Sequence, residues 1–429
     1  MSVASKLALG FNPAQRISSL TKPTVWHHMT PLAIKHKAVN LGQGFPGFSP
    51  PQFVREALVS VAREENGLNY MANQYARAAG NLLLVEALAK KVGKNLDRTV
   101  DPLTEVMVCN GATGVIFNAT QAFLNPGDEV VTFEPTFDIY TAQAEMCGAT
   151  VRPVPLALSA ERRWEFDIDA FRAAFTSRTR MLVFNTPHNP TGKVFTRAEQ
   201  EAIAAVVRDF PDVVVLSDEV YEHLLFDGRT HCSFAALPDM WERTLTVSSA
   251  GKTFSCTGWK VGWAVGPAHL TQPLGIVGSW VSFSVNTPAQ VALSRCLEEA
   301  ERPFQGAESY YAYLRGEYTR KREKLCTALA AAGLEPIAPE GSFFVMADTS
   351  RVAVPQEWVD RYRAEGADWA FACWLTAELG VACIPPSPFY SEANREAARS
   401  LCRFAFAQDD AVLDQAAERL LKLRDHLKQ

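Results

Sequence analysis

Short hydrophobic runs alternate with amphipathic stretches through the middle of the chain. Seven runs of four or five residues have the pattern of buried strands, since several are rich in β-branched side chains and bounded by turn residues. They are residues 106–109, 129–133, 150–153, 181–185, 213–217, 245–248 and 261–265. Hydrophobic positions at helical spacing lie between them, at 114–123, 137–146, 168–174 and 197–208. This alternation predicts an α/β fold, a three-layer sandwich around a mostly parallel seven-stranded sheet.

The C-terminal part of the chain has a different pattern. A long helical pattern at 309–332 is followed by a short strand at 342–347, a helix at 369–379, a strand at 401–407 and an amphipathic helix at 411–427. The prolines of residues 384–389 predict a loop. We expect a large domain at 51–308 and a smaller α+β domain at 309–429, which the N-terminal segment 1–50 joins.

Composition limits the function classes. The chain has 429 residues, of which 48% are hydrophobic and 21% charged, and its formal net charge is −5. These are the proportions of an ordinary globular protein, and the length fits two domains. The negative charge gives no electrostatic reason for binding nucleic acid or an anionic membrane surface. No apolar run approaches the ~20 residues that span a bilayer.

The cysteines and the N-terminus indicate a compartment. The nine cysteines are scattered and contain no C-x-x-C pair, which is typical of reduced thiols in an intracellular protein and not of a disulfide framework or a metal site. The first 55 residues contain no acidic residue, as in some mitochondrial transit peptides. We expect the cytoplasm, with the mitochondrion as the alternative.

Candidate chemistry is densest at residues 249–263, where two lysines, Lys252 and Lys260, lie eight positions apart among glycines and hydroxyls. A lysine amine reacts covalently with a carbonyl cofactor when its pKa is brought down toward neutrality from ~10.4. A second lysine can hold a phosphate as a point charge. This pairing points to pyridoxal 5'-phosphate, which also needs an acidic partner for its ring nitrogen.

Further candidates follow predicted strands or lie in them. Asp218 ends an apolar run, at the sheet edge where open α/β folds bind ligands, and Tyr221 follows three residues later. Residues 110–114 open a helix after a strand, so the backbone of Ala112 and Thr113 is predicted to donate to a phosphate, with Ser249 and Lys260 completing the cup.

Arg403 lies in an apolar strand pattern and needs a buried partner. The planar guanidinium of Arg403 suits the α-carboxylate of a substrate. Because Gly44 has no side chain, the backbone there would be able to approach the same carboxylate.

Ordered motifs along nearly the whole chain carry a family resemblance. Besides 249–263 they are Trp26 and residues 40–46, 73–75, 110–114, 126–130, 134–140, 185–193, 217–228 and 402–406. Together they resemble aminotransferases of fold type I, most closely the kynurenine aminotransferase, glutamine transaminase K and cysteine-conjugate β-lyase group.

The resemblance implies roles for several residues. Lys252 would hold the cofactor and transfer the proton, Asp218 would face the ring nitrogen, and Tyr221 would donate to the ring oxygen. Phe137 would stack on the ring, and Asn189 would bond both the cofactor and the substrate carboxylate. Tyr75 would reach the phosphate of a neighbouring subunit, which implies a homodimer with shared active sites. Trp26 and Phe283 would line the side-chain pocket, whereas Ser284 stands where the mammalian members carry a histidine.

The sequence therefore predicts a transaminase that moves the amino group of kynurenine, glutamine and aromatic or sulfur-containing amino acids to a 2-oxo acid, with a β-lyase side activity on cysteine S-conjugates. The alternatives are another enzyme of the same fold, such as an aspartate or methionine aminotransferase or an aminocyclopropane-carboxylate synthase, and a regulator without enzymatic activity. The G-x-G-x-x-G pattern at Gly42, Gly44 and Gly47 is interrupted by prolines, which argues against a dinucleotide site.

Overall fold

A seven-stranded sheet forms the centre of the protein. The computed structural model describes residues 12–63 and 70–428. The strands follow the order β2-β10-β9-β8-β7-β3-β4, and all pairs are parallel except the two made by β10. Their bounds are β2 Val106–Asn110, β3 Glu129–Glu134, β4 Thr150–Pro155, β7 Thr179–Asn185, β8 Val214–Asp218, β9 Thr244–Ser249 and β10 Val261–Val265. The predicted mostly parallel sheet is confirmed, and each strand starts and ends within two residues of its expected bounds.

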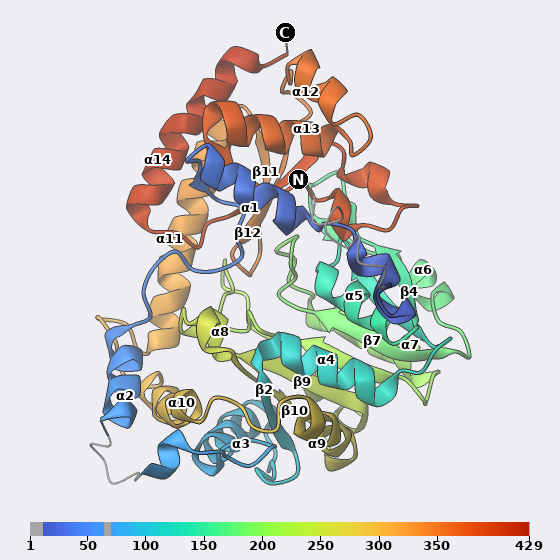
Figure 1. Ribbon diagram of the computed structural model, residues 1–429, viewed down its shortest axis with the longest axis vertical. Coiled ribbons are helices and arrows are strands. Elements are labelled where there is room, and N and C mark those ends of the chain that lie inside the picture. Colours follow the sequence, from blue (N-terminus) through green and yellow to red (C-terminus); the bar gives the residue numbers. More distant parts are fainter. Residues whose placement is uncertain (1–11, 64–69, 429) are drawn as a thin grey trace.

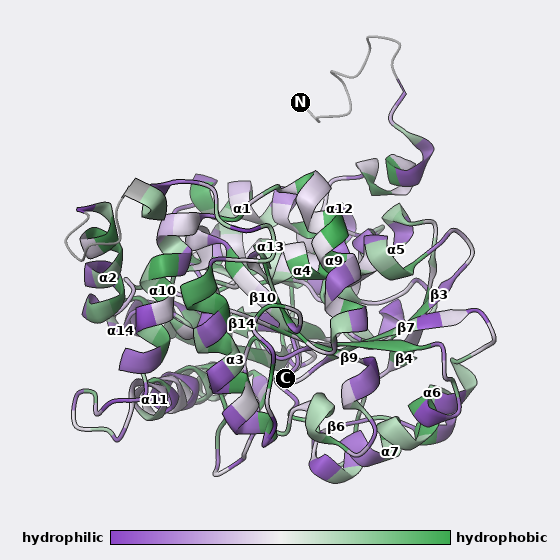
Figure 2. Cartoon of the chain, turned by 90° about the horizontal axis from the view of Figure 1, so that it is seen from below, coloured by the Kyte–Doolittle hydropathy of each residue, from purple (hydrophilic) through white to green (hydrophobic). Residues whose placement is uncertain are grey.

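Helices cover both faces of this sheet because its strands are apolar on both sides. Val130 and Leu216 pack in one core cluster with α4 (Gly111–Phe123), α5 (Asp138–Met146) and α9 (Ala268–Val281). The neighbouring strand residues Val131 and Val215 point the other way, into a cluster with α6 (Ile168–Ala173) and α7 (Arg197–Arg208). This alternation along each strand gives the three-layer sandwich. In Figure 2 the sheet strands are largely in the hydrophobic colour, whereas the surrounding helices carry both colours.

Both chain ends meet beside this sandwich. A three-stranded antiparallel sheet is formed by β11 (Glu335–Ile337), β12 (Phe344–Asp348) and β14 (Leu401–Ala405). The short strand β1 (Val39–Asn40) pairs with β13 (Val381–Ala382), so the N-terminal part is joined to the C-terminal elements by backbone hydrogen bonds. Figure 1 shows α1 (Val25–Lys35) among α12 (Gln356–Arg361), α13 (Ala367–Trp374) and α14 (Asp410–Leu420).

Five further helices are present in the described ranges. They are α2 (Gln52–Ala62), α3 (Leu82–Leu96), α8 (Ala250–Thr253), α10 (Thr287–Glu299) and α11 (Tyr310–Ala331). The helix expected at 369–379 is split, since α13 ends at Trp374 and a π-helical turn continues to Leu379. The one expected at 411–427 ends earlier, at Leu420, and a 3-10 turn follows it. Within the described ranges, no helix has the length and apolar character needed to cross a membrane.

Candidate active site

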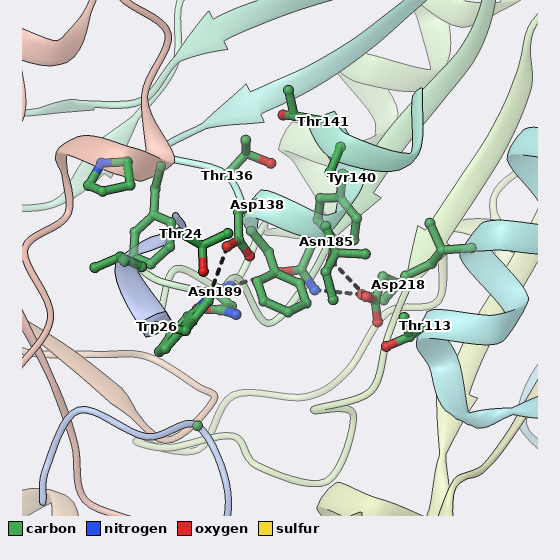
Figure 3. Close-up of a pocket in the computed structure, with 18 of the residues that line it drawn as sticks. Thr24, Trp26, Thr113, Thr136, Asp138, Tyr140, Thr141, Asn185, Asn189 and Asp218 are labelled. Atoms are coloured by element: carbon green, nitrogen blue, oxygen red, sulfur yellow. Dashed lines mark hydrogen bonds between the residues drawn. The ribbon is translucent and has the colours of Figure 1, made fainter. Parts of the chain in front are cut away.

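A cavity of about 1170 Å³ opens at the carboxyl ends of β7, β8 and β9. Asn185, the last residue of β7, lies in register with Asp218, the last residue of β8. Lys252 follows β9 on the short helix α8. Parallel strands end at the same edge of the sheet, and so residues far apart in sequence gather at one place. Figure 3 shows the part of the cavity that contains Asn185, Asn189 and Asp218.

Lys252 has the properties of a reactive amine. Its Nζ donates to the carbonyl oxygen of Gly44 at 2.5 Å. Burial and the positive charge of Arg403 lower the pKa of Lys252 to about 8, although the nearby carboxylate of Asp218 opposes this shift. The neutral amine is the nucleophile and the base, and this pKa leaves about a tenth of it neutral at pH 7, far more than for an exposed lysine.

Asp218 is a buried carboxylate held from two sides. The hydroxyl of Tyr140 donates to its Oδ2 at 2.6 Å, and the backbone N–H of Val220 donates to its Oδ1 at 3.2 Å. Burial raises the pKa of Asp218 to about 6, and these hydrogen bonds keep it from rising further. The side chain of Asn185 donates to the Asp218 carbonyl at 2.8 Å. Asp218 is therefore mainly ionised at pH 7 and fixed in position.

The N-terminus of α4 forms another part of the cavity wall. This 13-residue helix begins at Gly111, and the side chain of its N-cap residue, Asn110, makes no capping hydrogen bond. Ala112, Thr113, Ser249 and Lys260 all line the cavity there. Gly111 has a φ of +71°, and a Cβ added to it would lie 3.1 Å from Nζ of Lys260, so a glycine allows the backbone to come close to that amine. The arrangement offers backbone donors, a hydroxyl and a cation to an anion.

Among the residues that the structure describes, Arg403 is a buried cation without a carboxylate ion-pair partner. It is 1% exposed, and its guanidinium donates to Oδ1 of Asn189 at 3.1 Å and to the carbonyl of Gly42 at 2.9 Å. Its Nε has no hydrogen-bond partner within residues 12–63 and 70–428. The rings of Phe344, Trp26 and Phe389 surround it, with centroids 4.2, 5.3 and 5.3 Å from the guanidinium carbon. Burial lowers the pKa of Arg403 to about 10, so it remains charged at pH 7.

Most of the other predicted site residues also line the cavity. Trp26, Gly44, Phe137 and Tyr221 lie in its wall, and Tyr221 is buried. Phe137 lies immediately before α5 and contacts the ring of Tyr140 edge-on at 5.7 Å between centroids.

Tyr75 and Phe283 lie elsewhere. They are 78% and 62% exposed, do not line the cavity of their own chain, and pack edge to face at 5.1 Å between ring centroids. The hydroxyl of Ser284 accepts from the backbone of Ala76 at 3.0 Å and holds the two segments together. The structure therefore brings these two residues to each other and not to Lys252.

The sequence interpretation missed three polar residues. Tyr140 and Asn185 bond Asp218, and Asp138 accepts the indole hydrogen of Trp26 at 2.8 Å. A signal existed for two of them. Tyr140 lies one helical turn after Phe137, and Asn185 ends the strand next to that of Asp218.

Pyridoxal phosphate fits these residues. The uncapped helix and the glycine at 111 form a cradle for its phosphate, and an amine of lowered pKa and a buried carboxylate lie within the same cavity. The unpartnered Nε of Arg403 marks a place for a second anion, which suits the carboxylate of an amino acid.

Known proteins share this sequence and fold. Residues 36–420 match the model of the family "aminotransferase class I and II". The chain is 40% identical to the kynurenine–oxoglutarate transaminase of Dictyostelium discoideum over 432 residues, which cover 96% of this chain and 97% of that protein. Among solved structures, Bna3p of Saccharomyces cerevisiae has a TM-score of 0.90 at 35% identity and covers 97% of this chain and 100% of its own. YbdL of Escherichia coli, identified with a methionine aminotransferase function, has a TM-score of 0.84 at 35% identity. The match covers 96% of this chain and 100% of YbdL.

These matches confirm the family, the fold and the cofactor that the sequence predicted. The chain is a pyridoxal-phosphate-dependent enzyme whose substrates are an amino acid and a 2-oxo acid. It belongs to the class I and II aminotransferase family.

Proposed function

We propose that the enzyme transfers the amino group of kynurenine, glutamine, phenylalanine and methionine to a 2-oxo acid. The observation that carries this proposal is the buried guanidinium of Arg403 among Trp26, Phe344 and Phe389. A fixed cation suits the α-carboxylate, and aromatic walls suit an apolar or aromatic side chain beside it. The names of the Dictyostelium and E. coli relatives, which refer to kynurenine and methionine, agree with such a pocket.

The cofactor would be held at both ends. The N–H groups of Ala112 and Thr113, with Ser249 and Lys260, would hold its phosphate. Phe137, Asp218 and Tyr221 would hold its ring. When bound, pyridoxal phosphate supplies an electron sink that weakens the bonds at the substrate Cα. Asp218, as an ionised carboxylate, would keep a proton on the ring nitrogen, and Tyr221 would donate to the ring oxygen.

Lys252 would carry out the proton transfers. Its Nζ would hold the cofactor covalently and, once released, would remove the proton from the substrate Cα as a base and return it as an acid. Asn189 and Arg403, already joined by a hydrogen bond, would orient the substrate carboxylate. With a leaving group on Cβ, the same proton removal leads to elimination, which is the β-lyase side activity.

A homodimer with shared active sites completes the proposal. Tyr75 and Phe283 are exposed, and Trp280 and Ile276 on the adjoining α9 are 88% and 64% exposed. Exposed apolar side chains of this number and size are typical of an interface. On a second copy they could reach the cavity that they do not line in their own chain.

The domain division and the compartment are also proposals. The pairing of β1 with β13 supports a small domain made of residues 1–50 and 309–429 beside a large domain at 51–308; residues 1–11 and 64–69 lie outside the described part of the chain. All nine cysteines are free, which supports a reducing compartment such as the cytoplasm.

A panel of amino donors and 2-oxo acid acceptors with the purified, cofactor-loaded enzyme tests the proposal. We expect the highest kcat/KM for aromatic and medium-sized neutral donors. Aspartate as the best donor would instead favour an aspartate aminotransferase. Turnover of no donor, with the cofactor bound, would favour a regulator without enzymatic activity.

A further inference from the structure

A pair of opposite charges lies behind the turn that carries Asp218 and Tyr221. Both of those residues line the cavity, whereas Glu222, the next residue of the turn, does not. Its Oε1 lies 3.6 Å from Nζ of Lys91 and accepts from the hydroxyl of Ser248 at 3.2 Å. The side chains of Lys91 and Glu222 are only 11% and 16% exposed. Side-chain contacts thus join the turn to α3 and to β9.

Both members of this pair are charged at pH 7. Burial acts to raise the pKa of Glu222, but the positive charge of Lys91 outweighs it and lowers that pKa to about 2. Burial acts to lower the pKa of Lys91, but the carboxylate of Glu222 outweighs it, so that pKa is raised. Nζ of Lys91 also donates to Nε2 of His223 at 2.8 Å. Burial and the charge of Lys91 lower the pKa of His223 to about 3, so its ring is neutral and can accept this bond.

The start of the turn is held by a separate set of contacts. Glu219 accepts from the hydroxyls of Ser217 and Ser233 at 2.8 and 3.0 Å, and its other oxygen lies 2.6 Å from Nε2 of His231. The charges of Lys91 and Glu222 therefore act on the end of the turn, where Tyr221 lies.

Lys91 occupies a position that the helix would otherwise use for the hydrophobic core. It lies three residues after Leu88 and seven after Leu84, which are both fully buried on α3, so the three share one helical face. A buried ion pair adds little stability compared with apolar side chains of similar size, since both charges lose their hydration. Stability alone gives no reason for charges here, whereas positioning of the neighbouring turn does.

The contacts of Glu222 bear on two residues that would hold the cofactor. Tyr221 directly precedes it, and Ser249 directly follows Ser248 at the end of β9. The turn is tight, because the N–H of Leu224 donates to the carbonyl of Tyr221 at 2.8 Å. A movement of Glu222 would therefore move Tyr221 and the last residues of β9 together. A displacement of about 1 Å at a reacting centre can cost about 100-fold in rate.

We propose that the Lys91–Glu222 pair is a positioning element that fixes Tyr221 against the ring oxygen of the cofactor and Ser249 against its phosphate. Neither Lys91 nor Glu222 lines the cavity, so both act through the turn and β9. This inference rests on the proposed roles of Tyr221 and Ser249 and adds the residues that hold them in place.

The double variant Lys91→Met/Glu222→Gln tests the inference, because it removes both charges, keeps the net charge and leaves no unpaired buried ion. The measurement is the pH midpoint of the visible absorbance of the bound cofactor. A hydroxyl that donates to the ring oxygen competes with a proton held there, so loss of Tyr221 from its place should raise this midpoint. We expect a rise of at least about half a pH unit, in the same direction as in Tyr221→Phe.

Two further readouts follow from the same displacement. The dissociation constant of the cofactor should increase about tenfold, since Ser249 no longer meets the phosphate well. The value of kcat should fall while the KM of the amino donor changes little, because Arg403 and Asn189 keep their contacts.

Glu129→Gln is the matched control. Glu129 is the first residue of β3, at the sheet edge opposite the cavity, and its buried carboxylate lies 2.6 Å from the guanidinium of Arg178. This variant should lower the thermal midpoint of unfolding without moving the absorbance midpoint. Ser248→Ala removes only the hydrogen bond between β9 and Glu222. It should give a smaller shift of the same sign as the double variant, and it decides the question if the double variant does not fold.

The possible outcomes separate the inference from the proposed function. A lower thermal midpoint with an unchanged absorbance midpoint, or an equal shift in Glu129→Gln, would overturn the inference alone. No shift in Tyr221→Phe would overturn the role of Tyr221 together with the inference. The absorbance is measured without an amino donor, so the expected shifts in an enzyme that turns over no donor would overturn only the proposed function.

Discussion

Replacing Arg403 by alanine removes the guanidinium that we assign to the substrate α-carboxylate. A hydrogen bond between charged groups contributes about 1.5–3 kcal/mol. The Arg403 fork still has N–H groups to offer, since Nε is unpartnered and the terminal nitrogens make one bond each, to Asn189 and Gly42. Losing this interaction should lower kcat/KM by at least about one to two decades. Every donor shares the α-carboxylate, so kynurenine, glutamine and phenylalanine should lose activity to a similar degree.

A structural side effect of this change must be separated from the kinetic one. Without Arg403 the oxygens of Asn189 and Gly42 lose their donor, and each unsatisfied buried group costs about 1–3 kcal/mol of stability. The assay therefore compares variants that retain the visible absorbance of the bound cofactor and a cooperative thermal transition. Arg403→Lys keeps a positive charge but not the planar fork, and should fall between alanine and the native enzyme. Loss of activity toward one donor only would refute the assignment.

The other predictions concern the cofactor and the second subunit. Lys252→Ala should abolish transamination and the covalent label left by borohydride reduction, whereas Lys260→Ala should mainly weaken cofactor retention. A label mapped to Lys260 would contradict the assignment of the covalent role to Lys252. Because the pKa of Lys252 is lowered to about 8, covalent loading of the cofactor-free protein should accelerate with pH and level off above about pH 8, instead of rising toward ~10.4 as for an exposed lysine. Tyr140→Phe removes a hydrogen bond that lowers the pKa of Asp218, so in the cofactor-free protein this pKa should move up from about 6 by roughly one unit, as followed by infrared spectroscopy of the carboxyl group. Tyr318→Phe, whose buried hydroxyl has no partner in the described part of the chain, is the control. If active sites are shared, mixing inactive Lys252→Ala and Tyr75→Phe subunits should regenerate activity. A fully active monomer, detected by light scattering, would disprove the sharing of active sites.

The sequence was most informative where a residue's position follows from local pattern. The seven strands are predictable because apolar runs bounded by turns have few alternatives in a sandwich with both faces covered. Lys252 and Asp218 could be placed together because each follows such a strand, and parallel strands end at one edge. The register of β8 and β9 then brings them to the same cavity.

Contacts between distant segments were less predictable. The bond from Trp26 to Asp138 joins residues 112 positions apart, and that from Arg403 to Asn189 joins residues 214 apart. Neither periodicity nor spacing specifies such a contact, because it depends on how the chain ends pack against the sheet. Arg403 was still recognisable, since an arginine in an apolar strand needs a partner. Asp138 lacked such a signal, because a carboxylate at the start of a helix is common for a local electrostatic reason.

The division of labour in the cavity follows from the same topology. Lys252, Asp218 and the phosphate cradle come from the sheet and the turns at its edge, whereas Arg403, Trp26 and Gly44 come from the two chain ends. Proton transfer is thus carried by the sheet edge, whereas substrate recognition is shared between the chain ends and Asn189, which follows β7. Changes at Trp26 should alter the ratios among substrates while the covalent loading of Lys252 keeps its dependence on pH. The positive charge of Arg403 lowers the pKa of Lys252. Loss of Arg403 should therefore impair substrate recognition and also raise the pKa of the lysine.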